Sequence, residues 1–317
     1  MSESDHAKQM PDEGSSESGE PSSHGSTSEG PSKSPLFEAF NASRYQRQSL
    51  IRELQEETGR QVVSYTAAPG TPIDRDDVMP FVDLLHPIEE GSDVDLLLHT
   101  GGGDIDATEK LATMLWARIG ASGTLRVVVP DMAKSAGTLL ALAADAIVMS
   151  DSSDLGPIDP QRVEYRPDGT VRVLAIHHHL DAYAQCVKAV QDDPGDLAAQ
   201  MMLNKFDPAE IESFKVIMDR ARQLSDKHLK EGMFRVGGDG TYTRITGDLI
   251  DTNRWLTHSQ MIGHNEAEEI GLRIDYLSPS DPVWELIWRL HCLQRLTVGG
   301  GGPRKLFESD LVCLQLS

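Results

Sequence analysis

The chain has 317 residues, a net charge of −21, 39% hydrophobic residues and only 5% aromatic residues. This length allows one large domain or two small ones, with a core that is mainly aliphatic. So acidic a surface disfavours binding to nucleic acid or to anionic lipid, and no apolar run reaches the length that spans a membrane. The three cysteines form no CxxC pair, which predicts a cytoplasmic protein without disulfides or a zinc site.

The ends of the chain differ in composition from its middle. Ser, Gly and Pro fill 19 of the first 35 positions, so we expect residues 1–35 to form a disordered acidic tail. Residues 299–317 begin with four glycines and predict a flexible C-terminal tail. Residues 36–298 remain as the folded domain.

The first half of this domain alternates between strand and helix patterns. Residues 40–58 predict a helix, Gln61–Ala67 a strand, and Asp74–Leu85 a helix that opens with acidic residues. Further strands are expected at 94–99, 125–129 and 146–149, and further helices at 104–119 and 135–144. Strand and helix at this spacing indicate right-handed βαβ units in a parallel sheet.

The second half of the domain is less regular. Two short β-like runs within 154–175 surround Pro167, Asp168 and Gly169 and predict an inserted hairpin. Helices are expected at 178–192 and 207–230, a second hairpin at 235–245, and a helix that stops at Gly271. A Trp- and Leu-rich helix at 282–296 would pack on the core or on a neighbouring subunit.

The glycine turn LLLHTGGGD follows the buried strand 94–99. Glycine lets a substrate backbone approach closely, and amides at such a turn beside a helix start can bind a developing anion. The alternative is an ordinary tight turn between a strand and a helix, which can have the same glycine-rich sequence. The turn matches neither a phosphate-binding P-loop nor a dinucleotide fingerprint.

Ser135 lies between a predicted strand and a helix, in AKSAGTLLALAADAIVM. Small neighbours leave its hydroxyl uncrowded, and the helix start can stabilise a nearby anion, as a nucleophile needs. The alternative is that Ser135 is a helix N-cap, a position that serine favours.

Together these motifs resemble a known family. The stretches LLLHTGGGDIDATEKLATML and VVVPDMAKSAGTLLALAADAIVMSDSSDLGPIDPQ closely resemble the serine dehydrogenase proteinase family. That family is related to signal peptide peptidase A and, more distantly, to the Clp peptidase and the crotonases. The upstream SRYQRQSLIRELQEETGRQVVSY and the downstream WLTHSQMIGHNEAEEIGL are also similar, so the resemblance covers roughly residues 40–275.

The resemblance implies an α/β fold of the ClpP/crotonase type, with repeated ββα units and a mostly parallel sheet flanked by helices. It implies that Ser135 is the nucleophile and that Gly102 and Gly103 form the oxyanion turn, with a contribution from the region of Gly137. One departure is visible, because the family usually has proline where this chain has Gly101.

The resemblance leaves the general base open. In related peptidases a lysine on a similarly worded helix is the base, which points to Lys188 and a Ser-Lys dyad. For this role Lys188 has to be buried and neutral, whereas a helix lysine is ordinarily solvated. The rivals are His177, His178 and His179, which otherwise are plain loop histidines.

Two further residues are candidates for the site. His258, in WLTHSQ, matches a histidine of the family's closing motif and either contacts the site or anchors its segment. Asp159 lies in LGPIDPQ, which could be only a rigid loop flanked by prolines. Related folds place this segment beside the nucleophile, where Asp159 would orient the base.

The sequence therefore predicts a serine peptidase that hydrolyses peptides or unfolded proteins through an acyl-enzyme. We expect it to need no cofactor and no metal, to form homo-oligomers, and to bind no nucleic acid. Two alternatives stay open: a crotonase-like acyl-CoA enzyme, and a peptidase-like scaffold without catalytic activity.

Overall fold

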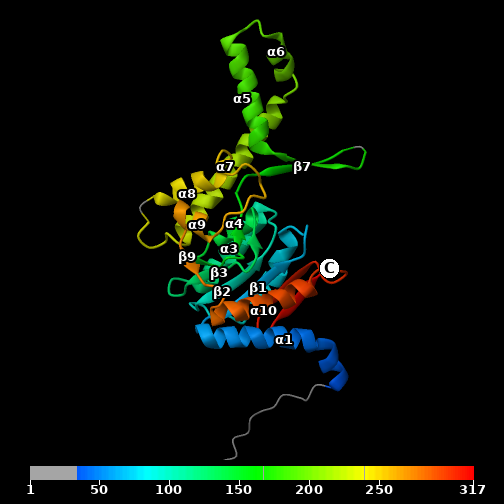
Figure 1. The fold of residues 1–317 in the computed structure, drawn as a ribbon, viewed down its shortest axis with the longest axis vertical. Helices are drawn as coiled ribbons and strands as arrows, with labels where there is room; N and C mark the ends of the chain where they lie inside the picture. Colours follow the sequence, from blue (N-terminus) through cyan, green and yellow to red (C-terminus); the bar gives the residue numbers. More distant parts are fainter. Residues whose placement is uncertain (1–33, 167, 239) are drawn as a thin grey trace, which may run out of the picture. The chain divides into compact units, whose positions relative to one another are not determined.

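The computed structural model describes residues 34–166, 168–238 and 240–317 (Figure 1). The predicted acidic tail, residues 1–35, lies outside the described residues up to position 33. The chain divides into two units, Met1–Phe40 and Asn41–Ser317. In the first unit the described residues from Pro35 onward open helix α1, Pro35–Thr58, and the rest of that helix belongs to the second unit.

The second unit contains a seven-stranded sheet with the order β11-β10-β1-β2-β3-β5-β9. Five neighbouring strands are parallel: β1 (Gln61–Ala67), β2 (Val94–His99), β3 (Leu125–Val128), β5 (Ala146–Met149) and β9 (Ile274–Tyr276). The predicted mostly parallel sheet flanked by helices is thereby confirmed. Its strands are near-continuous apolar runs because helices cover both faces.

The last two strands of the sheet are antiparallel, and they show that the prediction of a flexible tail at residues 299–317 is wrong. Residues after the glycine run form β10 (Lys305–Glu308) and β11 (Cys313–Leu316), and β10 pairs with β1. Phe307 is fully buried and stacks on Tyr65 with ring centroids 4.7 Å apart. The tail is ordered because this burial and the ladder bonds offset the entropy that its glycines lose.

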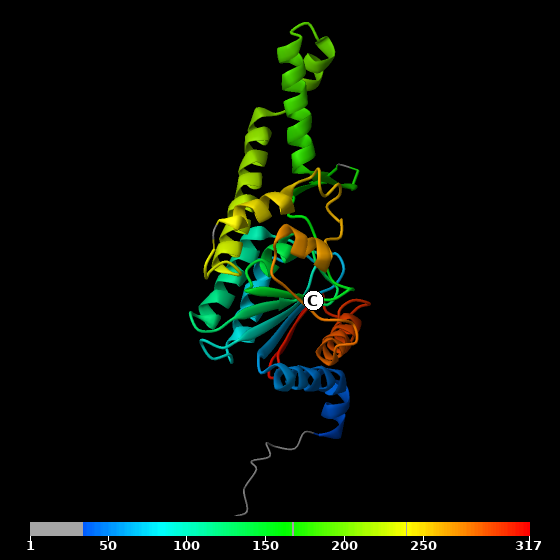
Figure 2. The same ribbon diagram turned by 60° about the vertical axis from the view of Figure 1, so that its left-hand side comes forward.

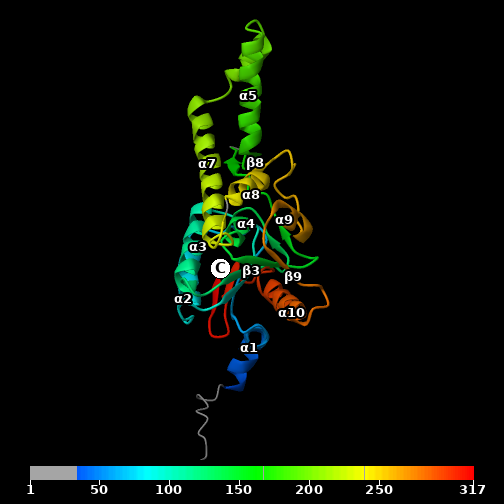
Figure 3. The same cartoon turned by 90° about the vertical axis from the view of Figure 1, so that its left-hand side faces the viewer.

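Residues of opposite parity along the strands face two different hydrophobic clusters. Leu97, Val128 and Val148 pack against α1 and α10 (Pro282–Thr297), while Leu96 and Val127 face the other side. That other side is covered by α2 (Val78–Leu85), α3 (Ile105–Ile119) and α4 (Ala136–Ala141), with the short 3₁₀ helix η1 (Arg75–Asp77) before α2. Figure 3 shows α2 and α3 on one side of the strands and α10 on the other.

A second, two-stranded layer lies past the carboxyl ends of β3 and β5. Strand β4 (Met132–Ala133) pairs in parallel with β6 (Asp154–Leu155), and Thr100, just after β2, forms a bridge with Ala133. This layer carries the chain into α4, so it fixes where residues 134 and 135 lie.

The insertion after β6 forms an arm beyond the sheet (Figures 1 and 2). It begins with the predicted hairpin, β7 (Gln161–Tyr165) and β8 (Val171–Ala175), and continues through three helices. These are α5 (Ile176–Asp192), α6 (Leu197–Leu203) and α7 (Pro208–Glu231).

The hairpin predicted at 235–245 is wrong, because residues from Thr241 onward form helix α8 (Thr241–Ile250). Its buried residues Ile245 and Leu249 are four apart and share one helix face, so packing overrides the strand preference of β-branched residues. Helix α9 (His264–Ile270) ends at Gly271 in the left-handed conformation, as predicted. None of the described helices combines the length and apolar character that crossing a bilayer requires.

Candidate active site

Ser135 occupies a strained turn between β4 and α4. The Gly137 amide donates to the Lys134 carbonyl at 2.7 Å, which closes a four-residue turn around it. Ser135 has φ 51° and ψ −115°, near the first central position of a type II′ turn, a position that favours glycine. It is the only described non-glycine residue with positive φ. Such strain persists where function requires it, which makes Ser135 a candidate nucleophile.

The Ser135 hydroxyl does not cap the helix that follows it. Ser135 precedes α4 but makes no side-chain cap hydrogen bond, and the residue is half-buried. Ser135 therefore occupies the N-cap position, but the interpretation that its hydroxyl caps the helix is wrong. The hydroxyl remains available for another partner.

The glycine turn touches the serine turn directly. A Cβ built on Gly102 would lie 2.7 Å from the Lys134 carbonyl oxygen, 2.8 Å from Ser135 Cβ and 3.2 Å from the Ala136 nitrogen. Gly102 also has φ +103°, which side chains rarely adopt. Only glycine fits here, because both the backbone angle and the close approach exclude a side chain.

The amides of this region are not equally available. The Gly102 amide donates to Thr100 Oγ1 at 3.1 Å, and the Gly137 amide is used inside the serine turn. Among the hydrogen bonds of the described residues, none uses the amides of Gly103 or Ala136. Of the two predicted oxyanion amides, only that of Gly103 is free, and the amide of Ala136 is a second candidate that the sequence did not predict.

Lys134 anchors the serine turn to its surroundings. Its ammonium group lies 2.8 Å from Asp154 Oδ2 and donates to the carbonyls of Leu155 at 2.9 Å and Gln260 at 3.3 Å. The side chain of Lys134 is 13% exposed. These contacts join the segments around residues 155 and 260 to the residue that precedes Ser135.

Those two segments carry the candidate acid and base. Asp159 follows the first segment and is 3% exposed, and His258 precedes Gln260. His258 Nδ1 lies 2.7 Å from Asp159 Oδ1, and His177 Nδ1 lies 3.9 Å from Asp159 Oδ2. Burial, and then the neighbouring His178, lower the pKa of His177. A buried carboxylate bonded to an imidazole is the pair that orients a general base.

The structure does not bring the other predicted bases into this pair. Lys188 is exposed and lies in the last two turns of α5, whose far end points away from the sheet (Figure 1). His178 is exposed at the start of α5, with its ring 4.0 Å from that of His177. His179 faces Glu210, with Nε2 3.6 Å from Oε2.

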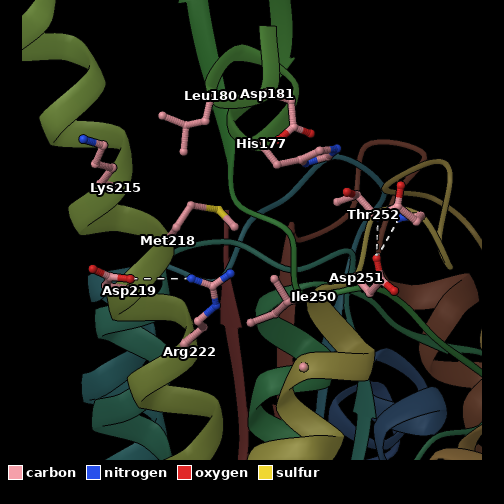
Figure 4. Close-up of a pocket in the computed structure, with 12 residues that line it drawn as sticks. His177, Leu180, Asp181, Lys215, Met218, Asp219, Arg222, Ile250, Asp251 and Thr252 are labelled. Carbon is pink, nitrogen blue, oxygen red and sulfur yellow. Dashed lines mark hydrogen bonds and ion pairs between the residues drawn. The ribbon is translucent and has the colours of Figure 1, made fainter. Parts of the chain in front are cut away.

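A pocket of about 570 Å³ opens beside His177 (Figure 4). Its apolar wall comes from Leu180, Met218 and Ile250, and its rim carries charges of both signs, including Arg222 of α7. The remaining lining residues are Asp181, Lys215, Asp219, Gly247, Asp251, Thr252 and Asn253. His177 therefore belongs both to this pocket and to the group that it forms with Asp159 and His258.

Comparison with known proteins gives a family match over a region that holds Ser135, the glycine turn and Asp159 but ends before His258. A family described as ClpP-like SDH-type serine proteinase matches residues 73–234. The chain is 31% identical over 251 residues to the uncharacterized protein MJ1495 of Methanocaldococcus jannaschii, covering 76% of this chain and 75% of that protein. It is 32% identical over 188 residues to the uncharacterized protein MJ0137 of the same organism, covering 59% of this chain and 55% of that protein. The chain thus spans little more than half the length of MJ0137.

Two solved structures are similar at low identity. One is a mutant of the 1510-N membrane-bound stomatin-specific protease in complex with a substrate peptide, at 14% identity and a TM-score of 0.38, covering 81% of this chain and 88% of that one. The other is a second mutant of the same protease, at 17% identity and a TM-score of 0.29, covering 70% of this chain and 99% of that one.

Proposed function

The chain belongs to the ClpP-like SDH-type serine proteinase family, and we propose that it hydrolyses peptide bonds through an acyl-enzyme on Ser135. The observation that carries this proposal is the strained Ser135 turn packed against Gly102. A positive φ at a serine between a strand and a helix presents its hydroxyl in the manner of a nucleophile elbow.

The oxyanion is bound by the amides of Gly103 and Ala136. Ala136 follows the nucleophile directly, and its nitrogen lies against Gly102 in the neighbouring turn. Both amides are free of other hydrogen bonds among the described residues. Two preorganised amides aimed at one oxygen stabilise the charge that develops in a tetrahedral intermediate.

We assign the general base to His258, with Asp159 as the residue that orients it. The Nδ1 contact of 2.7 Å to Asp159 leaves Nε2 to accept the Ser135 proton as Oγ bonds to the scissile carbonyl carbon. The imidazolium then protonates the leaving amine, and a water hydrolyses the ester by the same steps in reverse order. Exposed Lys188 lacks the burial that a neutral lysine base needs.

The pocket beside His177 is the proposed site for a substrate side chain. Its apolar wall suits an aliphatic side chain, and the charges at its rim suit the polar backbone around it. Homo-oligomer formation, a cytoplasmic location and the lack of nucleic-acid binding stay predictions from the sequence.

The test of the nucleophile is turnover of a casein-type substrate by wild type and Ser135→Ala. We expect the variant to lose turnover while its thermal midpoint stays within a few degrees. Ser213→Ala, at an exposed serine of α7, is the matched control and keeps full activity. Turnover by Ser135→Ala at the wild-type rate would rule out Ser135 as nucleophile.

The test of the base compares His258→Gln with Lys188→Ala. Removing a general base lowers kcat by about 10²–10⁴-fold, so we expect that loss in His258→Gln and a rate near wild type in Lys188→Ala. The reverse pattern would restore the Ser-Lys dyad and leave His258 as an anchor of its loop.

A further inference from the structure

The carboxyl end of β2 carries a buried histidine that peptide hydrolysis does not use. His99 is 1% exposed, and alternation along β2 places it on the face of Leu97, toward α10. There it meets His291 of α10, with ring centroids 5.0 Å apart. Asp131, between β3 and β4, completes the group: its Oδ2 lies 3.4 Å from His99 Nδ1 and 3.9 Å from His291 Nε2.

Three of the four ring nitrogens in this group lack a hydrogen-bond partner among the described residues. Both ring nitrogens of His99 and Nδ1 of His291 are buried without a hydrogen bond among the described residues. Buried polar atoms are ordinarily paired, so such a set calls for an explanation. The side chain of Asp131 is 45% exposed, so one donor of the group is in contact with solvent.

Burial disfavours protonation of either imidazole. Burial, then the charges of His291 and Arg295, lower the pKa of His99 to about 3. Burial, then Arg295, lowers the pKa of His291 to about 4. A neutral imidazole keeps a lone pair that can bind a metal ion, and the Asp131 carboxylate is the third donor of the group. Arg295, which opposes a cation here, lies with Nη1 3.4 Å from the Ala67 carbonyl oxygen.

We propose that His99, Asp131 and His291 bind one divalent transition-metal ion with the ligand preferences of Zn²⁺, with a remaining coordination position open to water. Two imidazoles and one carboxylate suit such ions, whereas Mg²⁺ and Ca²⁺ prefer oxygen ligands. All the donor atoms lie within 4.8 Å of one another. Ligands of a tetrahedral zinc ion are about 3.3 Å apart, so each pair of donor atoms has to close by roughly 1.5 Å at most.

This site would tie α10 to the two segments that lead into the candidate active site. His99 precedes Thr100, whose side chain accepts a hydrogen bond from the Gly102 amide. Asp131 precedes Met132, whose carbonyl accepts a hydrogen bond from the Thr100 amide at 3.0 Å. A bound ion would thus stiffen both the glycine turn and the approach to Ser135. This effect on catalysis depends on the proposed function, whereas binding of the ion does not.

The test is zinc binding by the full chain after treatment with a chelator and dialysis. Titration with ZnCl₂ in competition with a chromophoric chelator measures Kd, and elemental analysis measures the number of ions per chain. We expect one site that is weakened about 10–100-fold or more in Asp131→Asn and in His291→Gln. His86→Gln, at an exposed histidine before the β2 strand, is the matched control and keeps the wild-type Kd.

A second readout needs no catalytic activity. At a Zn²⁺ concentration of 100 times Kd, the thermal midpoint of wild type should rise by about 5 °C or more, with no rise for Mg²⁺ at the same concentration. Asp131→Asn is the decisive variant because its half-exposed side chain can change without disturbing the core. No binding by wild type, or binding with an unchanged Kd in Asp131→Asn, overturns the proposal and leaves the two histidines as unpaired core residues.

Discussion

Two neighbouring glycines with opposite constraints give the sharpest mutational prediction. Gly102 has φ +103° and no room for a Cβ, while a Cβ on Gly101 would meet nothing within 4 Å. At Gly102 the backbone strain alone costs about 1–3 kcal/mol. The added Cβ would also be roughly 0.6 Å too close to Ser135 Cβ, since ordinary contact begins at 3.4 Å.

Gly102→Ala should therefore push the glycine turn and the Ser135 turn apart. Misplacement of reacting groups by about 1 Å costs about 10²-fold in rate, and we expect a loss of that order in kcat/KM on a fluorogenic peptide. The thermal midpoint should fall by about 3–10 °C. Gly101→Ala should change neither quantity by more than a few-fold or a few degrees. Equal losses in the two variants, or full activity in Gly102→Ala, would refute this account of the contact.

Three further predictions concern stability and can be measured by denaturant unfolding. Ser135→Gly should be more stable than Ser135→Ala by about 1 kcal/mol, because glycine relieves the positive φ that alanine retains; equal stabilities would argue against strain at this position. Burial lowers the pKa of His228 to about 4, whereas a histidine in the unfolded chain titrates near 6.5. Below pH 6.5 the folded state therefore binds fewer protons than the unfolded state. The free energy of unfolding should fall by about 2 kcal/mol between pH 7 and pH 5 through this group. His228→Phe should show a shallower pH slope, and an unchanged slope would contradict the assignment. Asp77→Leu removes one of the two carboxylates that contact the buried Lys305 ammonium, the other being Asp74, and should cost up to about 3–5 kcal/mol. Asp77→Leu combined with Lys305→Met should recover much of that loss.

The sheet was predictable from the sequence because its parallel strands are buried on both faces. The strand at 94–99 was predicted with the bounds that β2 has, and Gln61–Ala67 coincides with β1. Such strands are apolar runs that end where turn residues begin. The C-terminal strands escaped prediction because four glycines precede them and indicate a flexible linker. The charges of Lys305 and Glu308 in β10 also give no sign of a buried strand. Their partners, Asp77 and Arg47, are more than 200 residues away in the sequence.

The candidate site was predictable only in part, for a similar reason. Ser135 and the glycine turn are local motifs, so the order of residues along the chain is enough to single them out. The contact between Asp159 and His258 joins residues 99 positions apart, and no local pattern reveals it. The hydrogen bond from the Gly102 amide to Thr100 Oγ1 likewise depends on side-chain geometry that the sequence does not show. Because of this bond, we assign the oxyanion to the amides of Gly103 and Ala136 and not to that of Gly102.

The most direct measurement is reaction of the intact chain with a fluorophosphonate probe, followed by mass spectrometry of the digested protein. An activated serine attacks phosphorus and keeps the adduct, while an ordinary hydroxyl does not react at the same rate. We predict one adduct, on the peptide that contains Ser135, and none in Ser135→Ala. No adduct on folded wild type, or an adduct on a different serine, would contradict the assignment of this residue as the nucleophile.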